Sequence, residues 1–351
     1  MLGKNAVKFS WLALIILILI TACEILPAIP GNTPSPEQIS EITSTEPTAT
    51  TASFTIIYPK RSSTPTATLQ PTSSETASES KTPTRTPTVA ATPDVRLDPA
   101  DWQNWPVIPT VSGYAKDLYQ QGLVNGNDPN RFSKVGDCQN ITTYFLAMFD
   151  YPNQYSLGED FEYLQAAIDH FSGSFSRESI ATDGGMNVAA VLAQIWADKE
   201  VCESLESPLE CELRLNTPSI VLISMEETWG RDNQIENYEK YMRQVIEIVI
   251  DAGAVPILTT KASNLEGNHQ INKVIANLAY EYNIPVWNFW LAVQPLKNHG
   301  LLEDGFHLTH GLNFFDNPSN LKNAWPVRNL TALQVIDSVW RQLNGMPLIG
   351  D

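Results

Sequence analysis

The sequence predicts an α/β domain in which helices cover both faces of a central parallel sheet. Strand-like and helix-like segments alternate from about residue 131 onward, and this alternation is typical of parallel sheets with crossover helices. Residues 219–224 (SIVLIS) form an apolar run rich in β-branched side chains, which is typical of a strand buried on both faces. In such sheets ligands bind beyond the carboxyl ends of the strands, so we expect a site at that edge.

Apolar periodicity and stop signals define the individual elements. Residues 235–252 have an amphipathic pattern that ends at Gly253, and Asn283 is a stop signal after the next apolar stripe. The predicted strands are residues 131–136, 176–182, 219–224, 254–260 and 285–289. The predicted helices are residues 139–149, 161–171, 187–198, 235–252, 269–282 and 331–343. Residues 94–351 are therefore expected to form one domain, since that length suits a single core.

Residues 1–22 are predicted to be a lipoprotein signal peptide. A short positive region precedes an unbroken apolar run at residues 11–20 (WLALIILILI), which is too short for a typical membrane span but suits the core of a secretory signal. The run ends in residues 20–23 (ITAC), which resemble the bacterial lipobox. That resemblance implies cleavage before Cys23 and a diacylglycerol on its sulfur. An ordinary cleaved signal and an uncleaved anchor are the alternatives.

A lipid on Cys23 would hold the exported chain on the outer face of a bacterial cell membrane. Residues 23–93 are mostly Thr, Pro, Ser, Ala and Glu with few aromatics. They lack the apolar surface needed to offset the entropy of ordering, so we predict a disordered, extended stalk. The net charge of −17 argues against nucleic acid as a partner, because phosphates require Lys and Arg. It also argues against a basic patch on anionic lipid.

The four cysteines divide into three expected roles. Cys23 is assigned to the lipid. Cys202 and Cys211 lie nine positions apart in a polar stretch, and an exported protein can keep a disulfide there. Two surface thiols are the alternative. Cys138 is then left alone, and an unpaired cysteine in an exported protein is either buried and inert or reactive and useful.

Four loops with polar residues or glycines are placed at the same edge of the predicted sheet. Cys138 follows the first strand, and Gly184 and Gly185 follow the second. Residues 225–229 (MEETW) follow the third, and residues 303–309 (EDGFHLT) lie near the C-terminus. Because the carboxyl ends of parallel strands share one edge, these loops can converge on one cleft.

These blocks, in this order, resemble the SGNH (GDSL) hydrolase superfamily over residues 131 to about 344. The family's Gly-Asp-Ser nucleophile block corresponds to residues 136–138 (GDC), and its Asp-x-x-His block to residues 304–307 (DGFH). Its oxyanion glycine corresponds to Gly184 or Gly185, and the asparagine of its third block to Thr228. The resemblance implies a flavodoxin-like three-layer α/β/α sandwich.

The resemblance also implies roles for the site residues. Cys138 would be the nucleophile, His307 its base, and Asp304 the group that orients the imidazole. The backbone N–H groups of Cys138 and of the glycine would bind the oxyanion, helped by the N-terminus of the helix after Cys138. Two departures from the family pattern matter. A thiol replaces the serine hydroxyl, and Thr228 replaces a longer carboxamide beside Glu226 and Glu227.

Two functions of different classes follow. The first is a hydrolase of carboxylic esters or thioesters, with a small-molecule or glycan ester as substrate. The second is a catalytically degenerate module that binds an acyl or carbohydrate ligand at the cell surface. A purely structural surface lipoprotein would leave the Asp-x-x-His block unexplained. No His, Cys, Asp and Glu cluster has metal-ligand spacing and no phosphate-binding glycine loop is present, so neither a metal nor a cofactor is predicted.

Overall fold

The computed structural model describes residues 96–225 and 234–349. Within them lies a four-stranded sheet with the order β1-β2-β3-β4. The strands are β1 (Asp128–Gly136), β2 (Pro218–Ser224), β3 (Val255–Thr259) and β4 (Val286–Trp287). The signal peptide, Cys23 and the stalk lie outside the described residues, and so does Thr228. No helix of the described chain is long and apolar enough to span a bilayer.

Every neighbouring pair of strands in this sheet is parallel. The end of β1 lies beside the end of β2, with Gly136 opposite Ser224. Farther along the sheet Ile223 is opposite Leu258, and Thr259 is opposite Trp287. The carboxyl ends of the strands therefore share one edge, as the α/β class requires.

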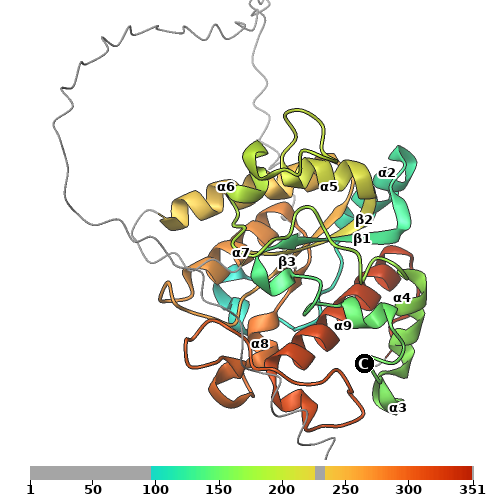
Figure 1. The fold of residues 1–351 in the computed structure, drawn as a ribbon, viewed down its shortest axis with the longest axis vertical. Helices are drawn as coiled ribbons and strands as arrows, with labels where there is room; N and C mark the ends of the chain where they lie inside the picture. Colours follow the sequence, from blue (N-terminus) through green and yellow to red (C-terminus); the bar gives the residue numbers. More distant parts are fainter. Residues whose placement is uncertain (1–95, 226–233, 350–351) are drawn as a thin grey trace, which may run out of the picture. The chain divides into compact units, whose positions relative to one another are not determined.

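Helices cover both faces of the sheet (Figure 1). Alternate residues of β2 enter different cores: Leu222 belongs to one and Val221 to the other. The first core includes residues of α2 (Gly113–Asn125), α4 (Gln165–His170), α8 (Phe289–Val293) and α9 (Ala324–Leu343). The second includes residues of α5 (Pro208–Asn216), α6 (Gln234–Asp251) and α7 (Gln270–Tyr282). This double burial explains the continuous apolar runs and confirms the predicted α/β class.

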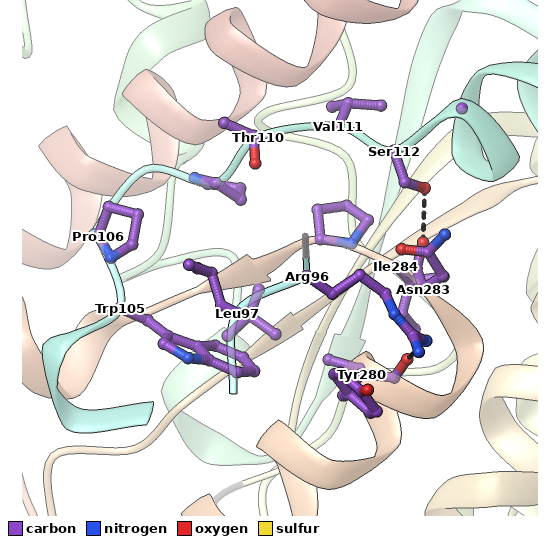
Figure 2. Close-up of a pocket in the computed structure, with 15 residues that line it drawn as sticks. Arg96, Leu97, Trp105, Pro106, Thr110, Val111, Ser112, Tyr280, Asn283 and Ile284 are labelled. Carbon is purple, nitrogen blue, oxygen red and sulfur yellow. Dashed lines mark hydrogen bonds between the residues drawn. The ribbon is translucent and has the colours of Figure 1, made fainter. Parts of the chain in front are cut away.

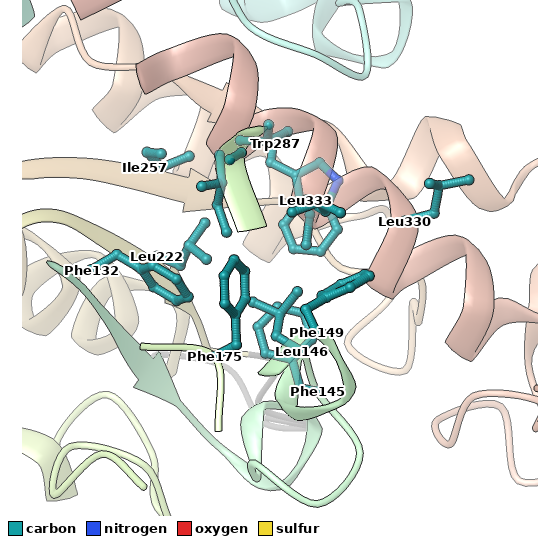
Figure 3. Close-up of a cluster of buried hydrophobic side chains, with 14 of the residues drawn as sticks. Phe132, Phe145, Leu146, Phe149, Phe175, Leu222, Ile257, Trp287, Leu330 and Leu333 are labelled. Atoms are coloured by element: carbon teal, nitrogen blue, oxygen red, sulfur yellow. The ribbon is translucent and has the colours of Figure 1, made fainter. Parts of the chain in front are cut away.

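Figure 3 shows the first core, where sheet side chains meet aromatic residues from the connection after β1. Phe132 makes edge-to-face contacts with Phe171 and Phe175 at centroid distances of 5.6 and 5.1 Å. Phe145 stacks on Trp287 at 6.1 Å. Such pairs add to the stabilisation from burial of their apolar area. The segment that follows Cys138 is thus packed against the sheet.

The predicted helix over residues 139–149 is wrong. The chain forms a 3₁₀ turn η2 (Cys138–Asn140), a further turn, and a second 3₁₀ turn η3 (Ala147–Asp150). Asn140 uses its side-chain amide to donate to the carbonyl of Ser224 at 2.7 Å. Ile141 then leaves with an extended ψ of 127° and Leu146 has a left-handed φ of 67°. These two backbone conformations interrupt a helix, so the segment forms separate turns.

Three other predicted elements differ from the structure. Residues 187–198 form the 3₁₀ turns η5 (Ala190–Leu192) and η6 (Gln194–Trp196) instead of a helix, because Ala193 between them has an extended backbone with φ −99° and ψ 119°. Residues 176–182 make a single β-bridge at Thr182 instead of a strand. The 161–171 helix is broken into α3 (Gly158–Phe161), η4 (Glu162–Leu164) and α4. Helices α2, α5 and α8 were not predicted. The other 3₁₀ turns of the described residues are η1 (Pro99–Asn104), η7 (Lys297–Gly300) and η8 (Asn320–Lys322).

Cys202 and Cys211 form a disulfide, the pairing that the sequence predicts. Cys211 lies on α5 and is buried, so it is not in a polar loop. Helix α5 begins with a capping box, in which Ser207 Oγ accepts from Glu210 N and the Glu210 carboxylate accepts from Ser207 N. A Ser-x-x-Glu pattern of this kind is a helix-start signal.

Replacing both Cys202 and Cys211 with serine is expected to lower the free energy of unfolding by about 2–3 kcal/mol. The bridge closes a short loop, with a sequence separation of 9, and loop-closure entropy predicts an effect of about this size. Urea unfolding of the double variant and the wild-type chain measures it. Equal midpoints with equal slopes would contradict the prediction.

Candidate active site

Cys138 lies in a tight turn directly after β1, at the carboxyl edge of the sheet. Asp137 closes the turn, because its Oδ1 accepts from Gln139 N at 3.0 Å and its carbonyl accepts from Asn140 N at 2.9 Å. Cys138 is half-buried and forms no disulfide. A partly accessible thiol in a rigid turn is suited to nucleophilic chemistry.

The end of β1 is a topological switch point. Gly136 pairs with Ser224 of β2 on one side and, in parallel, with Thr182 on the other. The N–H of Gly136 donates to Ala181 O at 3.1 Å on that second side. The chain therefore leaves β1 toward one side and later returns to the opposite side as β2. In open α/β sheets ligands bind in the crevice at such a reversal, and Cys138 is located there.

The predicted oxyanion glycines lie close to the Cys138 turn. A Cβ atom at Gly184 would be 3.6 Å from Ile141 Cδ1, three residues after Cys138. Gly185 has a φ of +90°, which L side chains rarely adopt. Both glycines are exposed. The loop after Thr182 thus brings backbone groups to the neighbourhood of the thiol.

Asp304 and His307 form the predicted pair. Asp304 Oδ2 is 2.6 Å from His307 Nδ1, and Asp304 Oδ1 accepts from the N–H groups of Phe306 and His307, each at 2.9 Å. The hydrogen bond from His307, followed by the two backbone N–H groups, lowers the pKa of the Asp304 carboxyl to about 2. The Nδ1 contact leaves Nε2 as the ring nitrogen available to a nucleophile.

The Asp304–His307 pair is open to solvent. The side chains of His307 and Asp304 are 59% and 48% exposed. Water screens charges at such positions, so the pair is less effective than a buried one. The loop itself is fixed by Leu301 and Leu308, which form an antiparallel bridge on either side of it.

Gln139 connects the Cys138 turn to the His307 loop. Its Nε2 donates to the carbonyl of Phe306 at 3.3 Å, across 167 positions of sequence. Gln139 follows Cys138 and Phe306 precedes His307, so this bond brings the thiol turn and the imidazole loop together. Gln139 is only 2% exposed. No sequence motif points to Gln139, because this residue falls inside the wrongly predicted helix over residues 139–149.

One predicted contribution to the site is wrong and another lies outside the described residues. No α-helix begins after Cys138, so the expected helix dipole is absent from this turn; a three-residue 3₁₀ turn has too few aligned peptides to replace it. Thr228, Glu226 and Glu227 lie outside the described residues.

The loop after β3 contributes a rigid rim that the sequence did not reveal. Lys261 and Glu266 form a buried ion pair at 2.6 Å, with side chains 0% and 1% exposed. The same loop carries the exposed Leu265, whose Cδ2 would be 3.4 Å from a Cβ at Gly305. Leu265 therefore borders the turn that carries Asp304 and His307.

A well-formed cavity lies at the opposite edge of the sheet (Figure 2). It measures about 380 Å³ and lies where β4 begins, with Trp105, Tyr280 and Val286 in its wall. In the cavity wall, Ser112 Oγ donates a hydrogen bond to Asn283 O at 2.6 Å. The residues that line it include no His, Cys, Asp or Glu, so they offer no base for a nucleophile. We therefore place the candidate active site at Cys138.

Among the described residues, the potential metal ligands that converge are Cys202, Glu206 and Cys211. The two sulfurs are joined in the disulfide, so they are not thiolates that could coordinate a metal.

No protein-family model matches this chain, and no curated protein matches it.

Proposed function

We propose that the chain is an SGNH-type hydrolase that cleaves carboxylic esters or thioesters through Cys138, His307 and Asp304. The observation that carries the proposal is the Gln139–Phe306 hydrogen bond, which joins the turn of a candidate nucleophile to the loop of a candidate base. The Asp304–His307 contact at 2.6 Å supports the base assignment. A small-molecule or glycan ester is the substrate class we propose.

We also propose the finer fold assignment, a flavodoxin-like three-layer sandwich. If the bridge at Thr182 is counted as a second strand in chain order, the sheet has the order 2-1-3-4-5. This is the order of flavodoxin-like sheets, in which the switch point lies beside the first strand. The SGNH resemblance of residues 136–138 and 304–307 agrees with it.

The reaction would proceed through an acyl-enzyme. Cys138 Sγ attacks the carbonyl carbon while its proton passes to His307 Nε2, and Asp304 stabilises the imidazolium. The backbone N–H groups of Cys138 and of Gly184 or Gly185 donate to the oxyanion. The leaving alcohol or thiol takes the proton from His307. Water, deprotonated by His307, then hydrolyses the thioester and regenerates the thiol.

The second candidate is a binding module on the same fold. Two observations favour it: the Asp304–His307 pair is largely exposed, and Thr228 replaces the family's carboxamide. Removal of one such donor costs about a hundred- to a thousand-fold in rate. A module of this kind would bind an acyl or carbohydrate ligand without turnover.

The location we propose for either function is the outer face of a bacterial membrane, through a lipid on Cys23. Residues 20–23 (ITAC) after an apolar run support it. Metabolic labelling with a fatty acid in a bacterial host tests it, with Cys23→Ala as the control. Equal labelling of both chains would contradict the anchor.

Trapping of the acyl-enzyme tests the hydrolase proposal. The full chain, purified in detergent, is mixed with p-nitrophenyl acetate and quenched in acid. Mass spectrometry of its peptides is expected to find one acetyl group on Cys138, and nitrophenolate release is expected to continue over many turnovers. Cys138→Ala is the matched control because it keeps every other cysteine. Acetylation without turnover would favour the binding module, and equal release by both chains would contradict the proposal.

A further inference from the structure

Arg328 is completely buried beneath the candidate active site. It lies on α9, and its Nη2 donates to Ser224 Oγ at 2.9 Å and to Asn140 Oδ1 at 3.3 Å. Ser224 ends β2, and Asn140 belongs to the turn after β1. One guanidinium therefore contacts the two segments that meet beside Cys138.

Aromatic rings surround this guanidinium. Its central carbon is 4.8 Å from the ring centroid of Phe145, 5.2 Å from Trp287 and 4.9 Å from Phe289. Phe145 and Trp287 belong to the core in Figure 3. Desolvated cation–π contacts are favourable and fix the orientation of the arginine. Burial of the charge is unfavourable by itself, so its polar contacts determine whether the arrangement is stable.

Asn140 transmits this constraint to the Cys138 turn. Its Nδ2 donates to Ser224 O at 2.7 Å and its backbone N–H to Asp137 O at 2.9 Å. The fit is tight, because a Cβ atom at Gly136 would lie 2.0 Å from Asn140 Nδ2. Arg328, Asn140 and Ser224 thus hold the turn against the end of β2, and a shift of any of them would move the thiol.

Helix α9 also holds the segment that follows His307. The N–H of Trp325 donates to Thr309 O at 3.0 Å, and the N–H of Ala324 donates to Thr309 Oγ1 at 2.9 Å. Both residues are in the first turn of α9, one helical turn before Arg328. The same helix therefore fixes the thiol turn through Arg328 and the imidazole loop through Thr309.

We infer that Arg328 is a positioning residue that sets Cys138 relative to His307 and to the oxyanion donors. This inference rests on the proposed function. A displacement of about 1 Å in a catalytic geometry costs roughly a hundred-fold in rate. Arg328→Met is therefore expected to lower kcat for p-nitrophenyl acetate by about ten- to a hundred-fold and to leave KM nearly unchanged.

Arg341 supplies a matched control on the same helix. It is 7% exposed, and its Nε donates to the two carboxylate oxygens of Asp337 at 2.8 and 2.9 Å. Arg341→Met also removes a buried guanidinium, but Arg341 lies 13 positions after Arg328, at the far end of α9. Both methionine variants are expected to unfold at lower temperature. Only Arg328→Met is expected to change kcat and the rate at which iodoacetamide alkylates Cys138.

Asn140→Ala keeps the guanidinium and breaks its link to the turn, so it tests the inference even if Arg328→Met fails to fold. It is expected to reproduce the change in kcat and in alkylation rate, and the double variant is expected to add little, since the two residues act through one contact. The alkylation rate is independent of ester turnover. If the wild-type chain cleaves no ester but alkylation still responds to Arg328→Met and Asn140→Ala alone, the hydrolase proposal fails and the positioning role stands. If Arg341→Met has the same effect on alkylation, or Arg328→Met and Asn140→Ala have none, the positioning role is overturned.

Discussion

Replacement of His307 with alanine should lower kcat/KM for ester hydrolysis by about 10³-fold, and Cys138→Ala should lower it at least as much. A general base contributes about 10²- to 10⁴-fold, and loss of a nucleophile removes the covalent route altogether. The two losses should not add, because the thiol and the imidazole act as one unit in the proposed mechanism. A Cys138→Ala, His307→Ala double variant should therefore resemble the Cys138→Ala chain.

Asp304→Asn should have a smaller effect than either change. The Asp304–His307 pair is largely exposed, so water can partly replace the carboxylate. Because its pKa is lowered to about 2, Asp304 stays ionised across the whole range in which the protein is assayed. A fall in activity on acidification from pH 7 to pH 4 must therefore come from another group.

His310→Ala is the matched control for these kinetics. His310 is exposed, lies three positions after His307, and has its ring 6.3 Å from that of Tyr144. Within the described residues, His310 makes no ion pair with a carboxylate like the one that Asp304 makes with His307. Progress curves at several ester concentrations give kcat and KM for each variant. An equal loss in His310→Ala and His307→Ala would contradict the assignment of His307 as the base.

The sequence predicted the elements whose pattern is set by burial alone. Strand β2 and helices α6 and α7 were located within a residue or two, because both faces of the strand and one stripe of each helix are apolar. The left-handed Asn283 ends α7 where the stop signal placed it. The wrong helix predictions fall where one residue leaves the helical backbone region, as Leu146 and Ala193 do.

The motif residues of the candidate site could be predicted from the sequence, but the buried residues around them could not. Cys138, Asp304 and His307 stand in short, ordered blocks, so a resemblance could find them. Gln139 and Arg328 donate hydrogen bonds to residues more than a hundred positions away, and a local sequence pattern does not predict such long-range contacts. An arginine inside a helix pattern is normally placed on the surface, so its burial could only come from the structure.

The stability of the protein should rise between pH 7 and pH 9 because of one buried amine. Lys134 on β1 is 0% exposed, and its Nζ donates to Phe175 O at 2.8 Å and to Thr142 Oγ1 at 3.0 Å. Burial, and then the positive charge of Arg177, lower the pKa of Lys134 from 10.5 to about 7. A neutral amine has two N–H donors, and two acceptors are in place.

The sign follows from proton binding in the two states. Between pH 7 and pH 10.5 the unfolded chain keeps the Lys134 proton and the folded chain releases it. The unfolded state binds more protons there, so the free energy of unfolding rises with pH across this window and levels off below pH 7. At about 1.4 kcal/mol per pH unit, the gain from pH 7 to pH 9 should be about 2–3 kcal/mol.

Urea unfolding at pH 7, 8 and 9 measures this gain, with Lys134→Met as the decisive variant. Methionine fills a similar apolar volume and carries no proton, so the pH-dependent rise should be lost while the stability at pH 7 is kept or increased. Lys116→Met, at an exposed position on α2, should keep the rise, because water solvates its amine in both states. Other groups that titrate in this window are common to all three chains and cancel in the comparison. A Lys134→Met chain with the wild-type slope would mean that Lys134 keeps its proton when the protein folds, and that the charged ammonium is held in the core by Thr142 and Phe175.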